Sequence, residues 1–121
     1  MVNAVEELDL DGLRARLGER WVPFRAYNVE NAGRPRVMAA LGALMEQFGA
    51  PAIEPAVLER IAVPTSLIWG RHDLATPLAA AEAASARYGW PLHVIEDCAD
   101  DPPVEQPEAF AEALGAAVKR G

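Results

Sequence analysis

The spacing of apolar residues changes near residue 62 and divides the chain into two parts. Before that point apolar residues recur every three or four positions, which is the period of an amphipathic helix. After it, residues 65–70 and 91–96 form two short apolar runs of the kind found in buried strands. The pattern predicts a helical segment over residues 1–61, followed by a strand-containing unit over residues 62–121.

Three helices are expected in the first part, over residues 8–18, 23–33 and 34–49. The apolar face of the third consists of Val37, Leu41, Leu44, Met45 and Phe48. Ordinary packing of this face within the protein is the first interpretation, and the lining of an apolar ligand pocket is the alternative. Several prolines then mark a boundary near residues 50–63, where one further helical turn is expected.

Each predicted strand is followed by a predicted helix. Thr76 is expected to cap an alanine-rich helix that begins at Pro77 and ends at Gly89. Pro107 begins a last helix, with an apolar face made of Phe110, Leu114 and Val118. This order predicts an α/β fold with a βαβα unit, in which the strands are parallel and the crossover is right-handed.

The composition narrows the classes of partner. The 121 residues include 18 acidic and 11 basic side chains, for a formal charge of −7, which disfavours nucleic acid and anionic membrane surfaces. No apolar run approaches the ~20 residues that span a bilayer. The first residues lack the basic and apolar regions of a secretory signal, and the single cysteine, Cys98, has no internal disulfide partner. We expect a cytoplasmic protein, and the abundant Ala, Gly and Arg are typical of a bacterial one.

Two acidic positions follow the predicted strands. Asp73 comes just after the first strand, and residues 97–101 come just after the second. In open parallel sheets, functional groups gather at the carboxyl ends of the strands. If the two strands pair, these loops lie side by side.

Two motifs in this part resemble the C-terminal portion of the α/β-hydrolases. In residues 63–77, "VPTSLIWGRHDLATP", Gly70 and Asp73 match the Gly-x-x-Asp that carries the acid of that family's triad. In residues 92–114, "LHVIEDCADDPPVEQPEAFAEAL", Glu105 and Pro107 match the end of its Gly-His-x-x-x-x-Glu-x-Pro loop. The resemblance implies a partial α/β-hydrolase fold, in which residues 1–61 correspond to a helical lid and residues 62–121 to the last two strands.

The sequence departs from the family pattern at the other two members of the triad. Asp100 stands where the family has its general-base histidine, and no Gly-x-Ser-x-Gly nucleophile elbow occurs in the chain. The resemblance therefore makes Asp73 a vestigial triad acid and Asp100 a replacement for the base.

Other residues offer poor substitutes for the missing groups. His72 is adjacent to Asp73 and points to the opposite side of an extended segment, which indicates a solvated turn residue. His93, Ser66 and Ser85 fall inside predicted strands or a helix, where packing explains them. Cys98 has no histidine placed to activate it and is expected to be a small buried residue.

Asp73, Asp100 and Asp101 offer a different chemistry if they cluster. Crowded carboxylates raise one another's pKa or attract a hard cation such as Ca²⁺ or Mg²⁺. The alternative is a solvated acidic loop, which is our prediction, because too few oxygen ligands occur at a recognisable spacing. We therefore expect no metal and no cofactor.

Three hypotheses about function follow. The first is a non-catalytic fragment or degenerate half of a hydrolase. The second is a hydrolase of ester or similar bonds, completed by another chain that supplies the serine elbow. The third is a module that binds a small ligand or a protein. In each case the predicted strand over residues 65–70 lacks a neighbour on one side, so we expect a homo-oligomer or a partner chain at that edge.

Overall fold

The computed structural model describes residues 10–32, 34–48 and 52–119, which form a mixed α/β structure that is mostly helical. The chain divides into two compact units, one comprising Gly18–Ile61 and the other the residues up to Leu17 together with those from Ala62 onward. No helix within the described ranges is both long enough and apolar enough to cross a membrane.

In its described part, the unit of residues 18–61 contains helices joined by loops and no strand. It contains the 3₁₀ turn η1 (Gly18–Arg20), α2 (Trp21–Ala32), α3 (Pro35–Phe48) and the single turn α4 (Pro55–Leu58). Helix α2 begins before Pro23, the predicted first residue. Proline lacks a backbone N–H. In the first turn of a helix this group has no partner within the helix, so a proline there does not prevent the helix from beginning earlier.

The apolar face of α3 is exposed. The exposed fractions are 41% for Val37, 49% for Leu41, 54% for Leu44 and 58% for Met45. Phe48, the fifth residue of the predicted face, lies outside the described side chains. Within this unit the predicted packing of the face is therefore not found for the described side chains. Val37, Leu41 and Leu44 instead line a hollow along α3.

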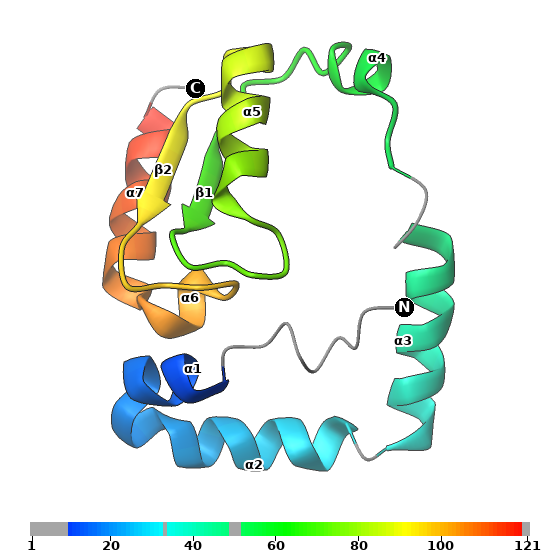
Figure 1. The fold of residues 1–121 in the computed structure, drawn as a ribbon, viewed down its shortest axis with the longest axis vertical. Coiled ribbons are helices and arrows are strands. Elements are labelled where there is room, and N and C mark those ends of the chain that lie inside the picture. The colour runs from blue at the N-terminus through cyan, green and yellow to red at the C-terminus, as the bar shows by residue number, and fades with distance from the viewer. Residues whose placement is uncertain (1–9, 33, 49–51, 120–121) are drawn as a thin grey trace. The chain divides into compact units, whose positions relative to one another are not determined.

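The other unit contains the strands. Its elements are α1 (Leu10–Leu17), β1 (Leu67–Gly70), α5 (Leu78–Tyr88), β2 (Leu92–Ile95), α6 (Pro102–Glu105) and α7 (Pro107–Lys119). The strands are parallel, with Leu67 opposite Leu92 and Gly70 opposite Ile95. In Figure 1, α5 lies in front of the strands and α7 behind them, and both helices contact both strands. The predicted βαβ arrangement is confirmed.

Helix α5 begins one residue later than predicted, but it ends as predicted. Its N-cap is Pro77 rather than Thr76. The Thr76 backbone is engaged elsewhere, because its N–H donates to Asp73 Oδ1 at 2.8 Å and its carbonyl accepts from Trp69 Nε1 at 2.8 Å. At the other end, Gly89 takes a left-handed conformation with φ of 71°, which its lack of a Cβ permits.

Helix α7 packs through small side chains rather than through the predicted face. Phe110 is half-buried, but Leu114 is 45% exposed and Val118 is 71% exposed. The other half-buried positions are all alanines, at 109, 113, 116 and 117. Small residues allow close approach of a helix to the strands, and this leaves the larger leucine and valine on its flank.

The buried core gathers at the carboxyl ends of the strands. Among the described residues, the buried apolar side chains are those of Leu17, Ala81, Ile95, Cys98 and Ala99. The loop after β2 crosses so close to the end of β1 that a Cβ at Gly70 would lie 1.8 Å from the carbonyl oxygen of Ala99. Only a residue without a side chain fits at this crossing.

Helix α1 belongs to the strand-containing unit, whereas the sequence groups it with the helical segment 1–61. It contacts α6, and Leu17 at its end is only 3% exposed. Its attachment depends on a buried ion pair, described in the next subsection, which joins residues too far apart in the sequence for any local pattern to reveal.

Replacing Gly70 with alanine should destabilise the protein by about 3 kcal/mol, because backbone atoms of another loop occupy the space of the new methyl group. Gly115→Ala is the matched control. It lies within α7 with nothing near its Cβ position, so it should gain up to about 1 kcal/mol from helix propensity. Chemical denaturation of both variants measures the difference, and equal stabilities would show that the crossing at Gly70 is loose.

Candidate functional site

Two loops meet at the carboxyl ends of the strands, as the sequence predicts. The backbone N–H of Arg71 donates to the carbonyl of Ile95 at 3.0 Å, which extends the strand pairing by one residue. The N–H of His72 then donates to the carbonyl of Cys98 at 2.8 Å. Together with the close packing at Gly70, these bonds hold the loop that carries Asp73 against the loop that carries Asp100.

A surface ion pair also links the two loops. Arg71 holds Glu96 through both of its guanidinium contacts, Nε to Oε2 and Nη2 to Oε1, the latter at 2.5 Å. Hydrogen bonding to Arg71 lowers the pKa of Glu96, and the same bond raises the pKa of Arg71. Both side chains are largely exposed, at 45% and 64%, so water screens the pair and its contribution to stability is small.

The carboxylate of Glu105 is the buried centre of the site. The residue is 1% exposed, and its two oxygens accept from the N–H of Ala99 at 3.1 and 3.2 Å and from the N–H of Asp101 at 3.2 Å. Nε of Arg16 on α1 donates to the same carboxylate. Two backbone donors and a guanidinium thus replace the water that this negative charge loses on burial. These bonds hold the loop after β2 in one conformation.

Asp100 lies between the two residues whose N–H groups Glu105 accepts, and its own side chain is exposed. Asp73 is half-buried and forms a turn, because its Oδ1 accepts the N–H of Thr76. The structure therefore places both candidate residues on adjoining loops. Within the described residues it shows no hydrogen bond between their carboxylates.

Asp101 is the carboxyl whose titration the loop perturbs. Burial raises its pKa, and the negative charges of Asp100 and Glu105 raise it further. Asp73 is not among these causes, so the three aspartates do not act as one cluster. Across the described part of the chain, no group of three His, Cys, Asp or Glu side chains is arranged to hold a metal ion.

Cys98 and Ser85 are not available as nucleophiles. Cys98 is completely buried, as predicted, and burial together with the charge of Glu105 raises the pKa of its thiol to about 12. The thiol therefore stays protonated at neutral pH and is unreactive. The hydroxyl of Ser85 donates to the carbonyl of Trp90 at 2.7 Å, where it fastens the end of α5.

The remaining candidates are not arranged as catalytic pairs. His72 is an exposed turn residue, as predicted. His93 lies on β2, half-buried, and its Nε2 is buried without a hydrogen-bond partner among the described residues. Ser66 precedes β1 and lines a hollow at the amino ends of the strands, away from Asp73.

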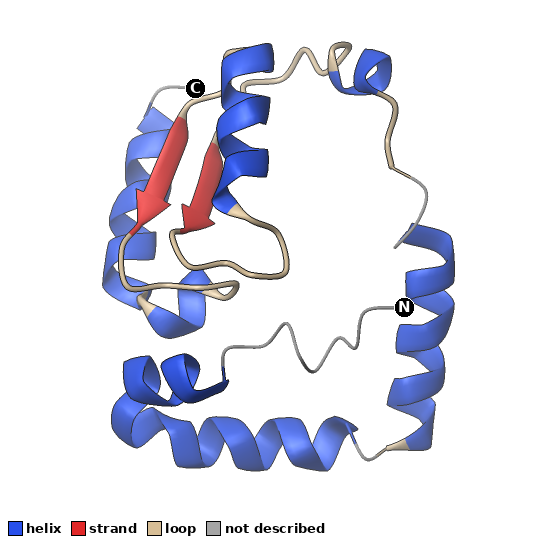
Figure 2. Ribbon diagram, in the orientation of Figure 1, coloured by secondary structure: helices blue, strands red, loops and turns tan. Residues whose placement is uncertain are grey.

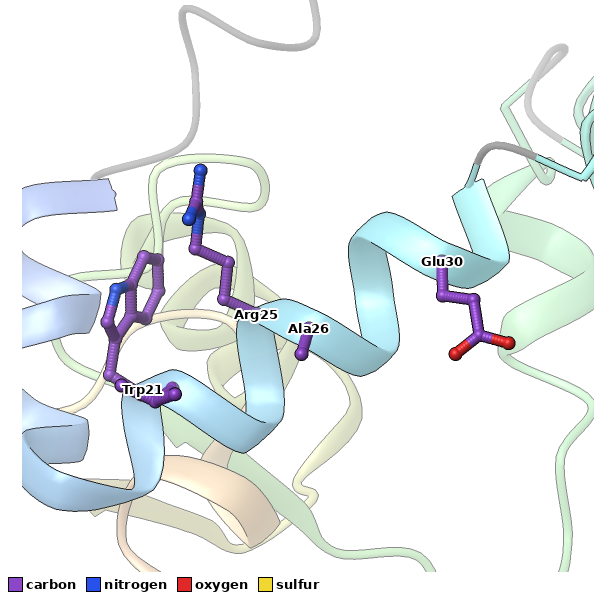
Figure 3. A pocket seen from close by; sticks show the side chains of 5 residues that line it. Trp21, Arg25, Ala26 and Glu30 are labelled. Carbon is purple, nitrogen blue, oxygen red and sulfur yellow. The ribbon is translucent and has the colours of Figure 1, made fainter.

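A second hollow lies on α2 and is lined by Trp21, Val22, Arg25, Ala26 and Glu30. In Figure 3 the side chains of Trp21 and Arg25 rise together from the helix, whereas Glu30 points away from them. Residues of one helix make up the whole described lining. It is therefore an open surface groove and provides no convergent polar groups for a ligand.

Glu105 and Arg16 are the functional residues whose roles the sequence does not reveal. The family motif marks Glu105 only by its spacing from Pro107. The signal that was available is an acidic residue at the end of a helical turn, four to six positions after two backbone donors. Nothing local marks Arg16, which lies 89 positions from its partner.

Glu105→Gln should destabilise the protein by about 3 kcal/mol, because it leaves the guanidinium of Arg16 without its buried counter-charge. The glutamine side chain also carries an NH₂ group, which is a donor, where two backbone N–H groups need an acceptor. Glu108→Gln, at an exposed position in the next helix, is the matched control and should change stability by less than about 0.5 kcal/mol. Urea denaturation of both variants is the measurement, and similar midpoints would contradict the role given to Glu105.

Asp101→Asn should raise the melting temperature at pH 7. The folded protein holds the Asp101 proton more tightly than the unfolded chain does. Stability therefore falls as pH rises from the unfolded aspartate value of about 3.9 through the raised folded value. The gain should disappear toward pH 3, where Asp101 is protonated in both states. A hydrogen bond from the Val104 backbone opposes the increase in the Asp101 pKa, and the side-chain oxygen of asparagine can accept the same bond.

The control for Asp101→Asn is Glu112→Gln, which makes the same charge change at an exposed position of α7. Thermal melts of both variants at pH 7 and pH 3 separate the local effect from a general reduction of negative charge. If the two variants gain equally at pH 7, the crowding around Asp101 carries no stability cost.

Comparison of the chain with protein-family models, with curated proteins and with solved structures finds no match. The resemblance to the α/β-hydrolases therefore depends on the motif residues, chiefly Gly70, Asp73, Glu105 and Pro107. The geometry described above gives three of these residues a physical role: a close crossing at Gly70, a turn at Asp73 and a buried charge at Glu105.

Proposed function

We propose that this chain is the C-terminal part of an α/β-hydrolase-like fold and has no hydrolase activity of its own. The observation that carries the proposal is the arrangement of Glu105. Its carboxylate fixes the loop in which position 100 is exposed, beside the turn that presents Asp73.

The two motifs of the resemblance depend on each other physically. The glycine of Gly-x-x-Asp has no side chain where the second loop crosses it, and the glutamate of Glu-x-Pro holds that second loop in place. A chain that kept one of them without the other would lose the contact between the loops. Their joint presence supports descent from a site in which an acid and a base faced each other.

The residue at the base position lacks the chemistry of a base in such a triad. An imidazole accepts a proton from the nucleophile while donating its other N–H to the acid, whereas an ionised carboxylate only accepts. Asp100 beside Asp73 would also place two negative charges where the family has an acid and an imidazole. Proton transfer from a serine hydroxyl is not supported by this pair.

The alternative is a hydrolase that another chain completes by pairing with the open side of β1. A second chain carrying a serine elbow would supply the nucleophile but not the base, because position 100 would still hold an aspartate. Loss of one triad member leaves only about 10³–10⁴-fold catalysis over water. The non-catalytic hypothesis is therefore the one that we propose.

The purified chain should hydrolyse p-nitrophenyl acetate and p-nitrophenyl butyrate no faster than Asp73→Asn does. Both should match the rate of a heat-denatured sample, which measures the background from surface nucleophiles. Activity that Asp73→Asn abolishes would overturn the proposal, because it would show that Asp73 serves a working site.

Asp100→His tests the assignment of position 100. By itself this change should restore no activity, because the nucleophile is still missing. The variant should nevertheless fold, since the side chain is exposed and the loop is held through backbone groups. Esterase activity in Asp100→His would mean that a serine or Cys98 of this chain acts as the nucleophile.

A further inference from the structure

One edge of the two-stranded sheet has no neighbour within the described residues. The sheet order is β1–β2, and no other described segment pairs with β1. Figure 2 shows the two strands side by side, with helices and loops around them. Strand pairs of this size are marginal by themselves, and an open edge offers unpaired backbone groups to another strand.

The register identifies which backbone groups face this edge. The N–H groups of Leu67 and Arg71 donate to Pro91 and Ile95, so odd-numbered residues from 67 to 71 face β2. Successive residues of a strand direct their backbone groups to opposite edges. Ser66, Ile68 and Gly70 therefore present their N–H and C=O groups to the open edge. Among the described residues, the carbonyl of Gly70 accepts a long bond of 3.4 Å from the N–H of Asp73.

The residues of β1 suit the middle of a sheet better than its edge. The strand sequence Leu67–Gly70 is apolar and half-buried up to the buried Gly70, with helices over both faces. It contains no proline, lysine or bulge, which are the features that protect natural edges. The outer edge of β2 differs, because the charged Glu96 follows that strand directly.

We propose that the open edge of β1 pairs with β1 of a second copy of this chain. A two-fold axis makes such strands antiparallel, and the edge is self-complementary with Ile68 opposite Ile68 of the copy. The outward N–H and C=O groups of Ile68 then bond reciprocally, and those of Ser66 bond with those of Gly70 on both sides of the axis. Leu67 lies opposite Trp69 of the copy, an aliphatic–aromatic pair that favours association.

The same unit supplies apolar area that a four-residue edge lacks. A stable interface buries about 800 Å² on each partner, more than one short strand offers. Val63, which is 69% exposed, precedes β1 and lines a hollow with Ala117 of α7. The exposed Leu114 and Val118 flank Ala117 on that helix. These residues provide apolar surface close to the segment that enters β1.

Sedimentation equilibrium of the full chain at micromolar concentration tests the pairing. We expect a species of twice the 13.0 kDa chain mass. Because each copy carries a charge of −7, salt should leave the dimer intact or strengthen it by screening the repulsion. A monomer of 13.0 kDa, or a dimer that salt dissociates, would overturn the proposal.

Two proline variants distinguish the edges of the sheet. Ile68→Pro removes an N–H that faces the open edge without removing a bond to β2, and it should give a folded monomer. Val94→Pro removes an N–H that faces the outer edge of β2, and it should stay a dimer. A dimer that persists in folded Ile68→Pro would show that the chains associate through another surface.

The variant Ile68→Cys tests the register even if the proline variants fail to fold. Opposed residues of a bonded antiparallel pair have Cα atoms about 5.5 Å apart, within the range of a disulfide. Mild oxidation should therefore crosslink Ile68→Cys into a dimer on a non-reducing gel. Val94→Cys should stay monomeric on the gel, and the native Cys98 is completely buried and does not compete. Failure of Ile68→Cys to crosslink, or equal crosslinking of both, would contradict the proposed register.

Discussion

The buried carboxylate of Glu105 organises the strand-containing unit. A carboxylate taken out of water costs several kcal/mol unless donors replace its hydration. Here two backbone N–H groups and Arg16 replace it, and each of them comes from a segment that must be held in place to serve. The helix that carries Arg16 is thereby fixed to the strand-containing unit, and the loop after β2 is fixed over Gly70. The close crossing of the two loops follows from this arrangement.

Under the proposed function, the carboxyl ends of the strands keep the loops of a hydrolase site without its nucleophile and base. The Asp73 carboxylate closes the turn after β1, whereas the loop that presents position 100 is held by the carboxylate of Glu105. Such a framework can persist after its catalytic residues change, because exposed side chains contribute little to stability. The combination of a firmly held loop and an exposed aspartate on it is what favours a non-catalytic relative of a hydrolase over a working enzyme.

The sequence predicts the parts of the fold that depend on local chemistry. Gly89 ends its helix, Pro107 begins one and the two apolar runs become parallel strands, since backbone conformation and periodicity decide these features. It does not predict the packing of α1 or the exposure of the α3 face, because both depend on partners distant in the sequence. Leu114 is a further example of a feature that local sequence does not predict. The apolar spacing places it on a helix, but the alanines beside it form the side of that helix that contacts the strands.

The pairing of Arg16 with Glu105 also has a consequence for biosynthesis. The partners lie 89 positions apart, so at roughly 5–20 residues per second the ribosome needs several seconds to supply the second after the first. During that interval the helices of residues 18–61 emerge and can fold, whereas α1 waits for its attachment site. The strand-containing unit therefore closes around a segment synthesised earlier. The contact between Arg16 and Glu105 joins residues distant in the sequence, and such a long-range closure is slow relative to the formation of local helices.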